Sequence, residues 1–163
     1  MLNIFLFSLV LAFGAGPSYI IHDVPFVMQD TQYCGPASLS SVLSYYGDAQ
    51  DQKTIGKAVY SPKLQGALIT DLENYGRERG FQTKSGRGHA ADIKEFLSEG
   101  KPVIVLVDLG FWVISKPHYL VVYGYNEQGF LAHNGFEAAQ LYLYDEFEKI
   151  WEKVGRSFLL VYR

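Results

Sequence analysis

The chain contains a single cysteine, Cys34, followed directly by Gly35 and Pro36. A cysteine reacts as its thiolate, and a helix N-terminus favours the thiolate because its free amide groups and dipole attract negative charge. Pro36 suits the first turn of a helix, where its missing N–H has no partner to lose. Gly35 would let a substrate approach the backbone. We predict that Cys34 begins a helix and is a nucleophile; the alternative is an inert cysteine before a glycine–proline turn.

A nucleophilic thiol needs an imidazole that takes its proton and later returns it to the leaving amine. The four histidines are His22, His89, His118 and His133. We expect His22 and His89 to lie exposed in loops, and His133 to lie along a strand. His118 is the best placed, because it begins an apolar run directly after Pro117. The alternative for His118 is a structural histidine at a strand end.

The base needs a partner that fixes its tautomer and ring plane. Asn134 follows His118 by 16 positions, across the turn sequence at 126–129. Two strands joined by a tight turn would bring these positions together. The alternative is that Asn134 makes a turn with Gly135, because Asn-Gly is a common turn dipeptide.

Peptide hydrolysis also requires donors for a tetrahedral oxyanion. The backbone N–H of Cys34 is one candidate. An upstream side-chain amide is the other, and both Gln29 and Gln32 are candidates for it.

Composition indicates one compact domain. The chain has 163 residues, of which 48% are hydrophobic and 19% charged. The net charge of −3 gives no basic surface, so nucleic acid is not an expected partner. The lone cysteine and scattered histidines lack the spacing of metal ligands, and no glycine-rich phosphate loop is present. We therefore expect no metal and no cofactor, and we expect a monomer.

The N-terminal sequence predicts a targeting segment. Residues 4–13 are almost continuously apolar, and small residues with Pro17 follow. This run has the length of a signal peptide and is short for a membrane-spanning helix, although it has no basic residue before it. We assign residues 1–16 to a signal peptide or an uncleaved hydrophobic anchor; the alternative is a core strand or helix. We expect an exported protein, periplasmic or extracellular, or one tethered to a membrane through this segment. A lone cysteine in such a compartment fits a reactive thiol.

The remaining residues, 20–163, are expected to form the domain. Hydrophobic periodicity predicts helices at 34–46, 70–79, 91–99 and 145–154, and strands at 81–85, 102–108, 118–125, 130–133, 140–143 and 158–162. Thr70 and Glu73 suggest a capping box for the second helix, and residues 86–88 suggest a turn. Helices come first and an antiparallel sheet follows, which indicates a two-lobed α+β fold.

Three segments together resemble the C39 family of papain-like cysteine peptidases. They are Val-Pro-Phe-Val-Met-Gln at 24–29, Cys-Gly-Pro-Ala at 34–37, and Lys-Pro-His-Tyr-Leu-Val-Val-Tyr-Gly-Tyr at 116–125. The resemblance extends over roughly residues 24–163, and the stretch from 60 to 113 is similar to the freestanding bacterial branch, in which no transporter follows.

The resemblance implies a papain-like fold and a role for each matching residue. Cys34 would be the nucleophile, His118 the general base, Asn134 the orienting residue and Gln29 the oxyanion donor. Many family members carry Asp where this chain has Asn134. The implied function is a thiol-dependent peptidase that acts on a protein or peptide. The alternatives are an inactive peptide-binding module and another papain-like thiol acyltransferase or amidase.

Overall fold

The computed structural model describes residues 16–163, so nearly all of the expected signal or anchor segment lies outside the described residues. The helices are α1 (Cys34–Tyr45), α2 (Gln52–Val59), α3 (Ile69–Glu78), α4 (Ala90–Ser98) and α5 (Tyr144–Glu152). The strands are β1 (Tyr19–Ile20), β2 (Tyr60–Ser61), β3 (Gly66–Ala67), β4 (Gln82–Arg87), β5 (Val103–Asp108), β6 (Pro117–Tyr125), β7 (Gly129–His133), β8 (Gln140–Leu143) and β9 (Ser157–Tyr162).

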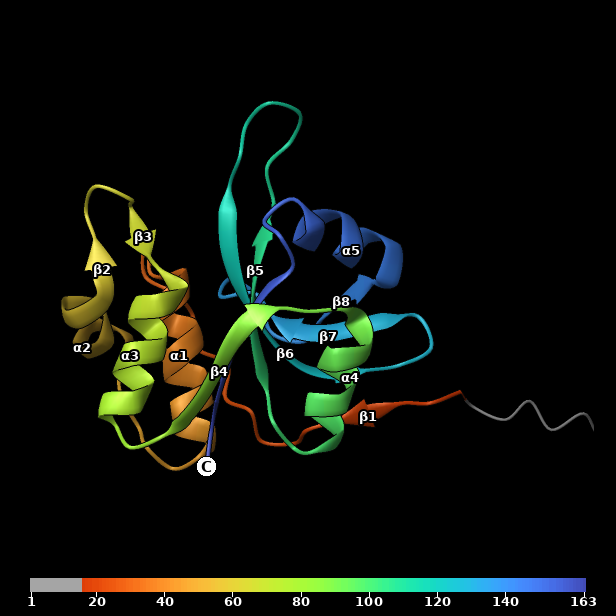
Figure 1. Ribbon diagram of the computed structural model, residues 1–163, viewed down its shortest axis with the longest axis horizontal. Helices are drawn as coiled ribbons and strands as arrows, with labels where there is room; N and C mark the ends of the chain where they lie inside the picture. The colour runs from red at the N-terminus through yellow and green to blue at the C-terminus, as the bar shows by residue number, and fades with distance from the viewer. Residues whose placement is uncertain (1–15) are drawn as a thin grey trace, which may run out of the picture.

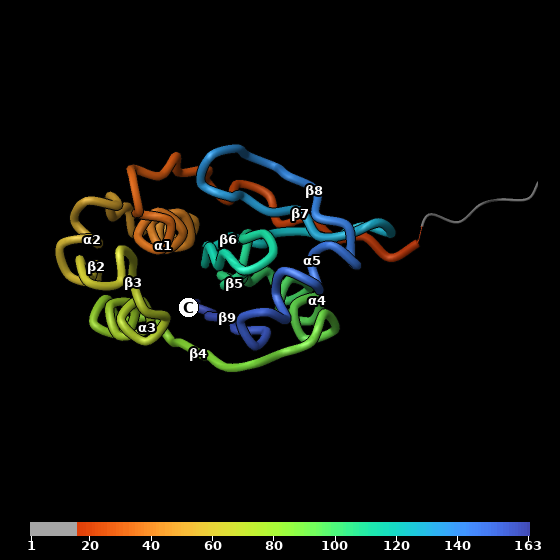
Figure 2. The backbone as a smooth tube through the Cα atoms, turned by 90° about the horizontal axis from the view of Figure 1, so that it is seen from above, coloured from red at the N-terminus to blue at the C-terminus, as the bar shows by residue number. Residues whose placement is uncertain are grey.

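Seven strands form one antiparallel sheet in the order β4-β9-β5-β6-β7-β8, and β1 also pairs with β6. Helices α1, α2 and α3 gather on one side of this sheet, and α4 and α5 lie on the other (Figures 1 and 2). The central strands are therefore covered on both faces, which explains why β5 is a continuous run of β-branched and aliphatic residues. The expected α+β fold with two lobes is confirmed.

Helix α1 packs its apolar stripe against the sheet. Leu39, Val42 and Leu43 are fully buried, and the helix contacts β6 and α3. Burial of three such side chains favours folding by about 1.5–3 kcal/mol each. This packing fixes the first residue of α1, Cys34, beside the strand that carries His118.

The helix expected at 70–79 is present as α3, but its expected capping box is wrong. The residue before α3 is Leu68, which makes no side-chain cap. Glu73 is buried instead, where its carboxylate accepts hydrogen bonds from Thr83 and Ser85 and pairs with Arg77. Tertiary contacts to β4 thus replaced the local cap.

The turn expected at 86–88 is also wrong for its first two residues. Gly86 and Arg87 continue β4, where they pair with Phe158 and Ser157 of β9. The small hairpin β2–β3 was not predicted. Its strands have two residues each, which is too short for a periodic pattern to appear. Within residues 16–163, no helix is long and apolar enough to span a membrane.

Candidate active site

A cleft of about 970 Å³ lies between the two lobes. One wall comes from the β2–β3 hairpin and the start of α3, and the other from the start of β6 and the turn after β7. The lining residues that matter for chemistry are Gln29, Gln32, Cys34, His118 and Phe136. The cleft thus brings together three of the four predicted site residues as lining, and Asn134 lies directly behind it, bonded to His118.

Cys34 is the first residue of α1 and is half-buried as a free thiol. Burial raises the pKa of the Cys34 thiol, because a thiolate is less well solvated there than in water. Hydrogen bonding by the backbone of Tyr119, Gly35 and Cys34 itself favours the thiolate and partly opposes this effect on the pKa. The helix start does stabilise negative charge, but desolvation outweighs it.

Gly35 has a packing role that the sequence did not indicate. A side chain at this position would come within 3.2 Å of Ala67 and Tyr119. Tyr119 is buried, and its hydroxyl donates a hydrogen bond of 2.9 Å to the carbonyl of Ala67. The missing side chain of Gly35 therefore lets α1, β3 and β6 meet at the floor of the cleft.

His118 lies near the start of β6 and is 3% exposed. Its Nε2 lies 2.6 Å from the carbonyl oxygen of Asn134. A carbonyl only accepts, so Nε2 carries the hydrogen and Nδ1 of the neutral ring has a free lone pair. Burial lowers the pKa of His118; the Asn134 carbonyl opposes this, and the charge of Lys116 adds to the lowering. The ring is therefore a neutral imidazole at neutral pH, with Nδ1 as a proton acceptor.

The two expectations for Asn134 both describe part of what the structure contains. Its backbone carbonyl holds His118, whereas its side-chain oxygen accepts hydrogen bonds from the backbone N–H groups of Phe136 and Glu137. This Asx-turn shapes the chain that leaves β7. Asn134 lies beside His118 as predicted, but the contact is made by the main chain.

The turn also places Phe136 against the imidazole. The rings of His118 and Phe136 are stacked, with centroids 5.5 Å apart and an interplanar angle of 11°. Phe136 lies in this turn, beyond the end of β7 at His133. Sequence analysis missed Phe136, because the conformation of this turn depends on the side-chain hydrogen bonds of Asn134 and cannot be seen in a hydrophobic pattern.

Gln29 and Gln32 both line the cleft, so both candidates for the oxyanion donor remain near Cys34. The backbone N–H of Gln29 bonds to the carbonyl of Gly135, and its side-chain oxygen is buried with no hydrogen-bond partner among the described residues. Gln32 differs, because its side-chain oxygen accepts a hydrogen bond of 2.5 Å from the hydroxyl of Tyr60.

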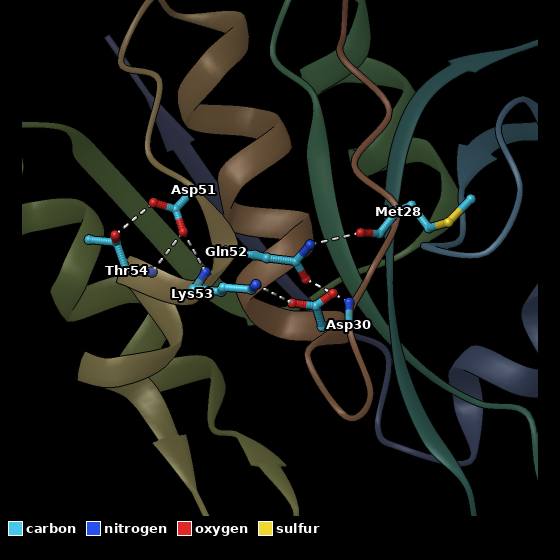
Figure 3. Close-up of polar contacts among 6 residues, drawn as sticks. All are labelled: Met28, Asp30, Asp51, Gln52, Lys53 and Thr54. Atoms are coloured by element: carbon cyan, nitrogen blue, oxygen red, sulfur yellow. Dashed lines mark hydrogen bonds and ion pairs between the residues drawn. The ribbon is translucent and has the colours of Figure 1, made fainter.

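Gln52 holds the segment that carries Gln29, as Figure 3 shows. Its side-chain nitrogen donates to the carbonyl of Met28 at 2.7 Å, and its side-chain oxygen accepts from the N–H of Asp30 at 2.8 Å. The preceding residue, Asp51, caps α2 through the N–H groups at positions 53 and 54. One helix start therefore fixes the backbone on both sides of Gln29. Sequence analysis missed Gln52, because its partners are 22 and 24 positions away.

The other histidines have surroundings that do not suit a base. His133 lies on β7 and is 8% exposed, with its Nε2 3.0 Å from the carbonyl of Val24 and its Nδ1 accepting from the N–H of Ala139. His22 and His89 are both exposed, as expected, and both lie outside the lining of the cleft; His89 directly precedes α4. Within residues 16–163, no group of three or more His, Cys, Asp or Glu side chains is arranged to hold a metal ion.

Asp108 ends β5 and shapes the chain before His118. Its carboxylate accepts hydrogen bonds from the N–H groups of Gly110 and Lys116 and from the hydroxyl of Ser115. These bonds, that of Lys116 first, hold the pKa of Asp108 below its usual range. These hydrogen bonds join the two ends of the loop between β5 and β6, so β6 starts in a fixed position.

The family model described as the Peptidase_C39-like family matches residues 21–158 of the chain. This chain belongs to that family. The match includes all four predicted site residues, Gln29, Cys34, His118 and Asn134. No curated protein sequence matches the chain.

Solved structures of C39 peptidases share the fold. A structure from Bacillus anthracis described as a C39-like peptidase has a TM-score of 0.77 at 14% identity, covering 90% of this chain and 98% of its own. The peptidase domain of Streptococcus ComA, a bifunctional ABC transporter, has a TM-score of 0.71 at 24% identity over 86% and 99%.

A third structure is a double glycine motif protease from an AMS/PCAT transporter in complex with its leader peptide. It has a TM-score of 0.70 at 18% identity, covering 90% of this chain and 99% of its own. At these identities the likeness shows the fold of a C39-like peptidase.

Proposed function

We propose that this C39-like protein is a thiol-dependent peptidase in which Cys34 is the nucleophile and His118 the general base. The observation that carries the proposal is the state of His118 in the shared cleft. One ring nitrogen is fixed by Asn134, and the other has a free lone pair in a cleft that Cys34 also lines. Nucleophilic catalysis by cysteine requires a base that is held in one tautomer and has a free nitrogen in the same cleft as the thiol.

The reaction begins from a neutral pair. Burial raises the pKa of Cys34 and lowers that of His118, so the thiol keeps its proton until substrate binds. Nδ1 of His118 accepts this proton as the sulfur attacks the scissile carbonyl. The imidazolium then gives the proton to the leaving amine, and an acyl-enzyme remains. Water, deprotonated by the same Nδ1, attacks the acyl-enzyme and releases the second product with the thiol restored.

The oxyanion that forms during attack needs preplaced donors. The backbone N–H of Cys34 is one donor, because the first N–H groups of a helix have no partner within the helix. The side-chain amide of Gln29 is the other. Its buried oxygen lies against Gly135, which leaves the nitrogen as the end that can donate into the cleft. Gln32 is the weaker candidate, because it is exposed and the Tyr60 hydroxyl fixes its side-chain oxygen on the β2 side.

Asn134 orients His118 through its main-chain carbonyl in this proposal, and its side chain keeps that carbonyl in place by closing the turn. Phe136 stacks on the imidazole and shields the hydrogen bond between His118 and Asn134 from water. A shielded hydrogen bond is stronger than one exposed to solvent.

The proposal is tested with an unbiased peptide library, a thiol-reactive inhibitor and intact mass spectrometry. The wild-type chain should cleave peptides and gain one inhibitor adduct at Cys34, and Cys34→Ala should do neither while keeping its circular dichroism spectrum. An adduct without cleavage would indicate a peptide-binding module instead. Cross-linked products in place of cleaved ones would indicate acyl transfer to amines. Full activity in Cys34→Ala would refute the mechanism.

A further inference from the structure

The loop between β5 and β6 has an unusual tip, which projects from the body of the protein at the top of Figure 1. Four successive large apolar side chains are exposed there: Phe111 (84%), Trp112 (93%), Val113 (90%) and Ile114 (72%). No charged residue lies between Asp108 and Lys116. Soluble proteins expose single apolar side chains commonly, but a contiguous group of this kind marks an interaction site.

The loop is built to present this tip. Its base is closed by the carboxylate of Asp108 and by the hydrogen bond from the N–H of Leu109 to the carbonyl of Lys116. Gly110 is required, because a side chain there would overlap the carbonyl of Ile114. Trp112 has a φ of 58°, a backbone conformation that bulky residues rarely adopt, and its side chain is almost fully exposed.

The chemistry of the tip fits a lipid surface better than a protein surface. Tryptophan and phenylalanine are favoured at the boundary between headgroups and acyl chains, where an apolar ring can bury while its edge stays near water. Two lysines, Lys116 and Lys153, stand at the base of the loop, and the ammonium of Lys153 donates to the carbonyl of Gly110. Cations at that depth attract anionic headgroups.

The same chain carries a second apolar segment, residues 4–13, whose composition is that of a signal peptide or membrane anchor. As an uncleaved anchor it would hold the protein at a bilayer, and as a signal peptide it would take the protein across one. Stable attachment to a bilayer generally takes two weak signals rather than one.

We propose that the tip at residues 111–114 inserts into the interface of an anionic lipid bilayer. The loop runs directly into Lys116, Pro117 and His118, which line the cleft, so insertion would hold the mouth of the cleft close to the lipid surface. The proposal concerns membrane binding alone and does not depend on peptidase activity.

The chain contains its own reporter for this test. It has two tryptophans, of which Trp112 is almost fully exposed and Trp151 is fully buried. The full chain is mixed with vesicles of phosphatidylcholine and phosphatidylglycerol whose acyl chains carry bromine near the headgroup. Emission of the wild type minus that of Trp112→Phe isolates the emission of Trp112 from that of Trp151.

Trp112 emission should move to shorter wavelength and be quenched by the brominated lipid. Val113→Asp should remove the quenching and weaken vesicle binding about tenfold or more, because a charge replaces a buried apolar side chain. The matched control is Leu141→Asp on β8, an exposed apolar site away from the loop, which should leave both unchanged. Thermal unfolding shows that each variant folds.

Vesicle-bound protein whose Trp112 stays unquenched would overturn the proposal. Quenching that persists unchanged in Val113→Asp would overturn it too. A shift of Trp112 emission that needs no lipid and grows with protein concentration would instead assign the tip to self-association. A shift that needs a protein or peptide partner and not lipid would assign it to protein recognition.

Discussion

His118 and His133 lie on neighbouring strands, are both buried, and both have a pKa lowered by burial, yet their surroundings differ in one respect. Both ring nitrogens of His133 are used, by Val24 and by Ala139, and the ring stacks on Tyr123. Of the two ring nitrogens of His118, only Nε2 has a hydrogen-bond partner among the described residues.

The difference shows that burial and a shifted pKa do not identify a catalytic histidine. A ring whose two nitrogens are both bonded can only support structure, whereas one free nitrogen at a cleft can exchange a proton. His133 does support the site indirectly, because its partner Val24 belongs to the segment that leads to Gln29.

The largest expected effect is a difference in kcat between variants of His118 and variants of His133. His118→Ala should lower kcat by about 100- to 10,000-fold, the usual contribution of a general base. His133→Ala should keep kcat within about tenfold but lower the free energy of unfolding by about 1–3 kcal/mol, because the groups at Val24 and Ala139 lose their partner. Steady-state kinetics and urea unfolding measure both. Comparable losses of kcat in the two variants would end the distinction.

The turn that follows β7 should be the next most sensitive site. Gly135 has a φ of 80°, and a side chain there would lie 2.4 Å from the buried oxygen of Gln29. Gly135→Ala should displace that amide and lower kcat by about 100-fold, the loss expected for one oxyanion donor.

The matched control is Gly47→Ala, which has a φ of 85° but nothing within 4 Å of the added carbon. It should bring the backbone strain of about 1–2 kcal/mol without a change in kcat. If Gly135→Ala loses only stability, as Gly47→Ala should, Gln29 is not the donor.

The segment that carries Gln29 is held by His133 at one end and by Gln52 at the other. Gln52→Ala should therefore lower kcat by about tenfold, with a smaller change in KM. Its neighbour Asp51 offers a control, because Asp51→Ala removes the cap of α2 for about 1 kcal/mol but leaves Met28 and Asp30 in place (Figure 3). Equal kinetic losses in both variants would show that α2 as a whole, and not Gln52, supports the site.

The smallest effect concerns pH. The acidic limb of kcat/KM should report the pKa of His118 and lie below about pH 6.5, because burial disfavours the imidazolium. Lys116→Met removes a nearby positive charge, so the imidazolium is favoured and the limb should move to higher pH by roughly a few tenths of a unit. Lys153→Met is the control and should leave the limb in place. A limb that moves to lower pH in Lys116→Met would contradict this electrostatic assignment.

Much of the fold could be predicted because its long elements carry strong periodic patterns. Helix α1 and strands β5, β6 and β7 lie where the apolar residues indicated, and Cys34 begins its helix as expected. The site could be predicted in outline for the same reason, since a cysteine at a helix start and a histidine at a strand start need only these elements to be brought together.

The details depended on contacts that a local pattern does not contain. The turn after β7 engages the side chain of Asn134, and its main-chain carbonyl meets the His118 ring. Glu73 has the spacing of a capping residue but is buried against β4. Each of these outcomes was decided by partners far away in the sequence.

The hydrogen bond between the Tyr119 hydroxyl and the Ala67 carbonyl has a mechanical consequence. It joins the lobe that carries the β2–β3 hairpin to the strand that carries His118, within the lining of the cleft. Widening the cleft would break this bond, at a net cost of about 0.5–1.5 kcal/mol. The Tyr119 hydroxyl therefore opposes separation of the two walls of the cleft that Cys34 lines.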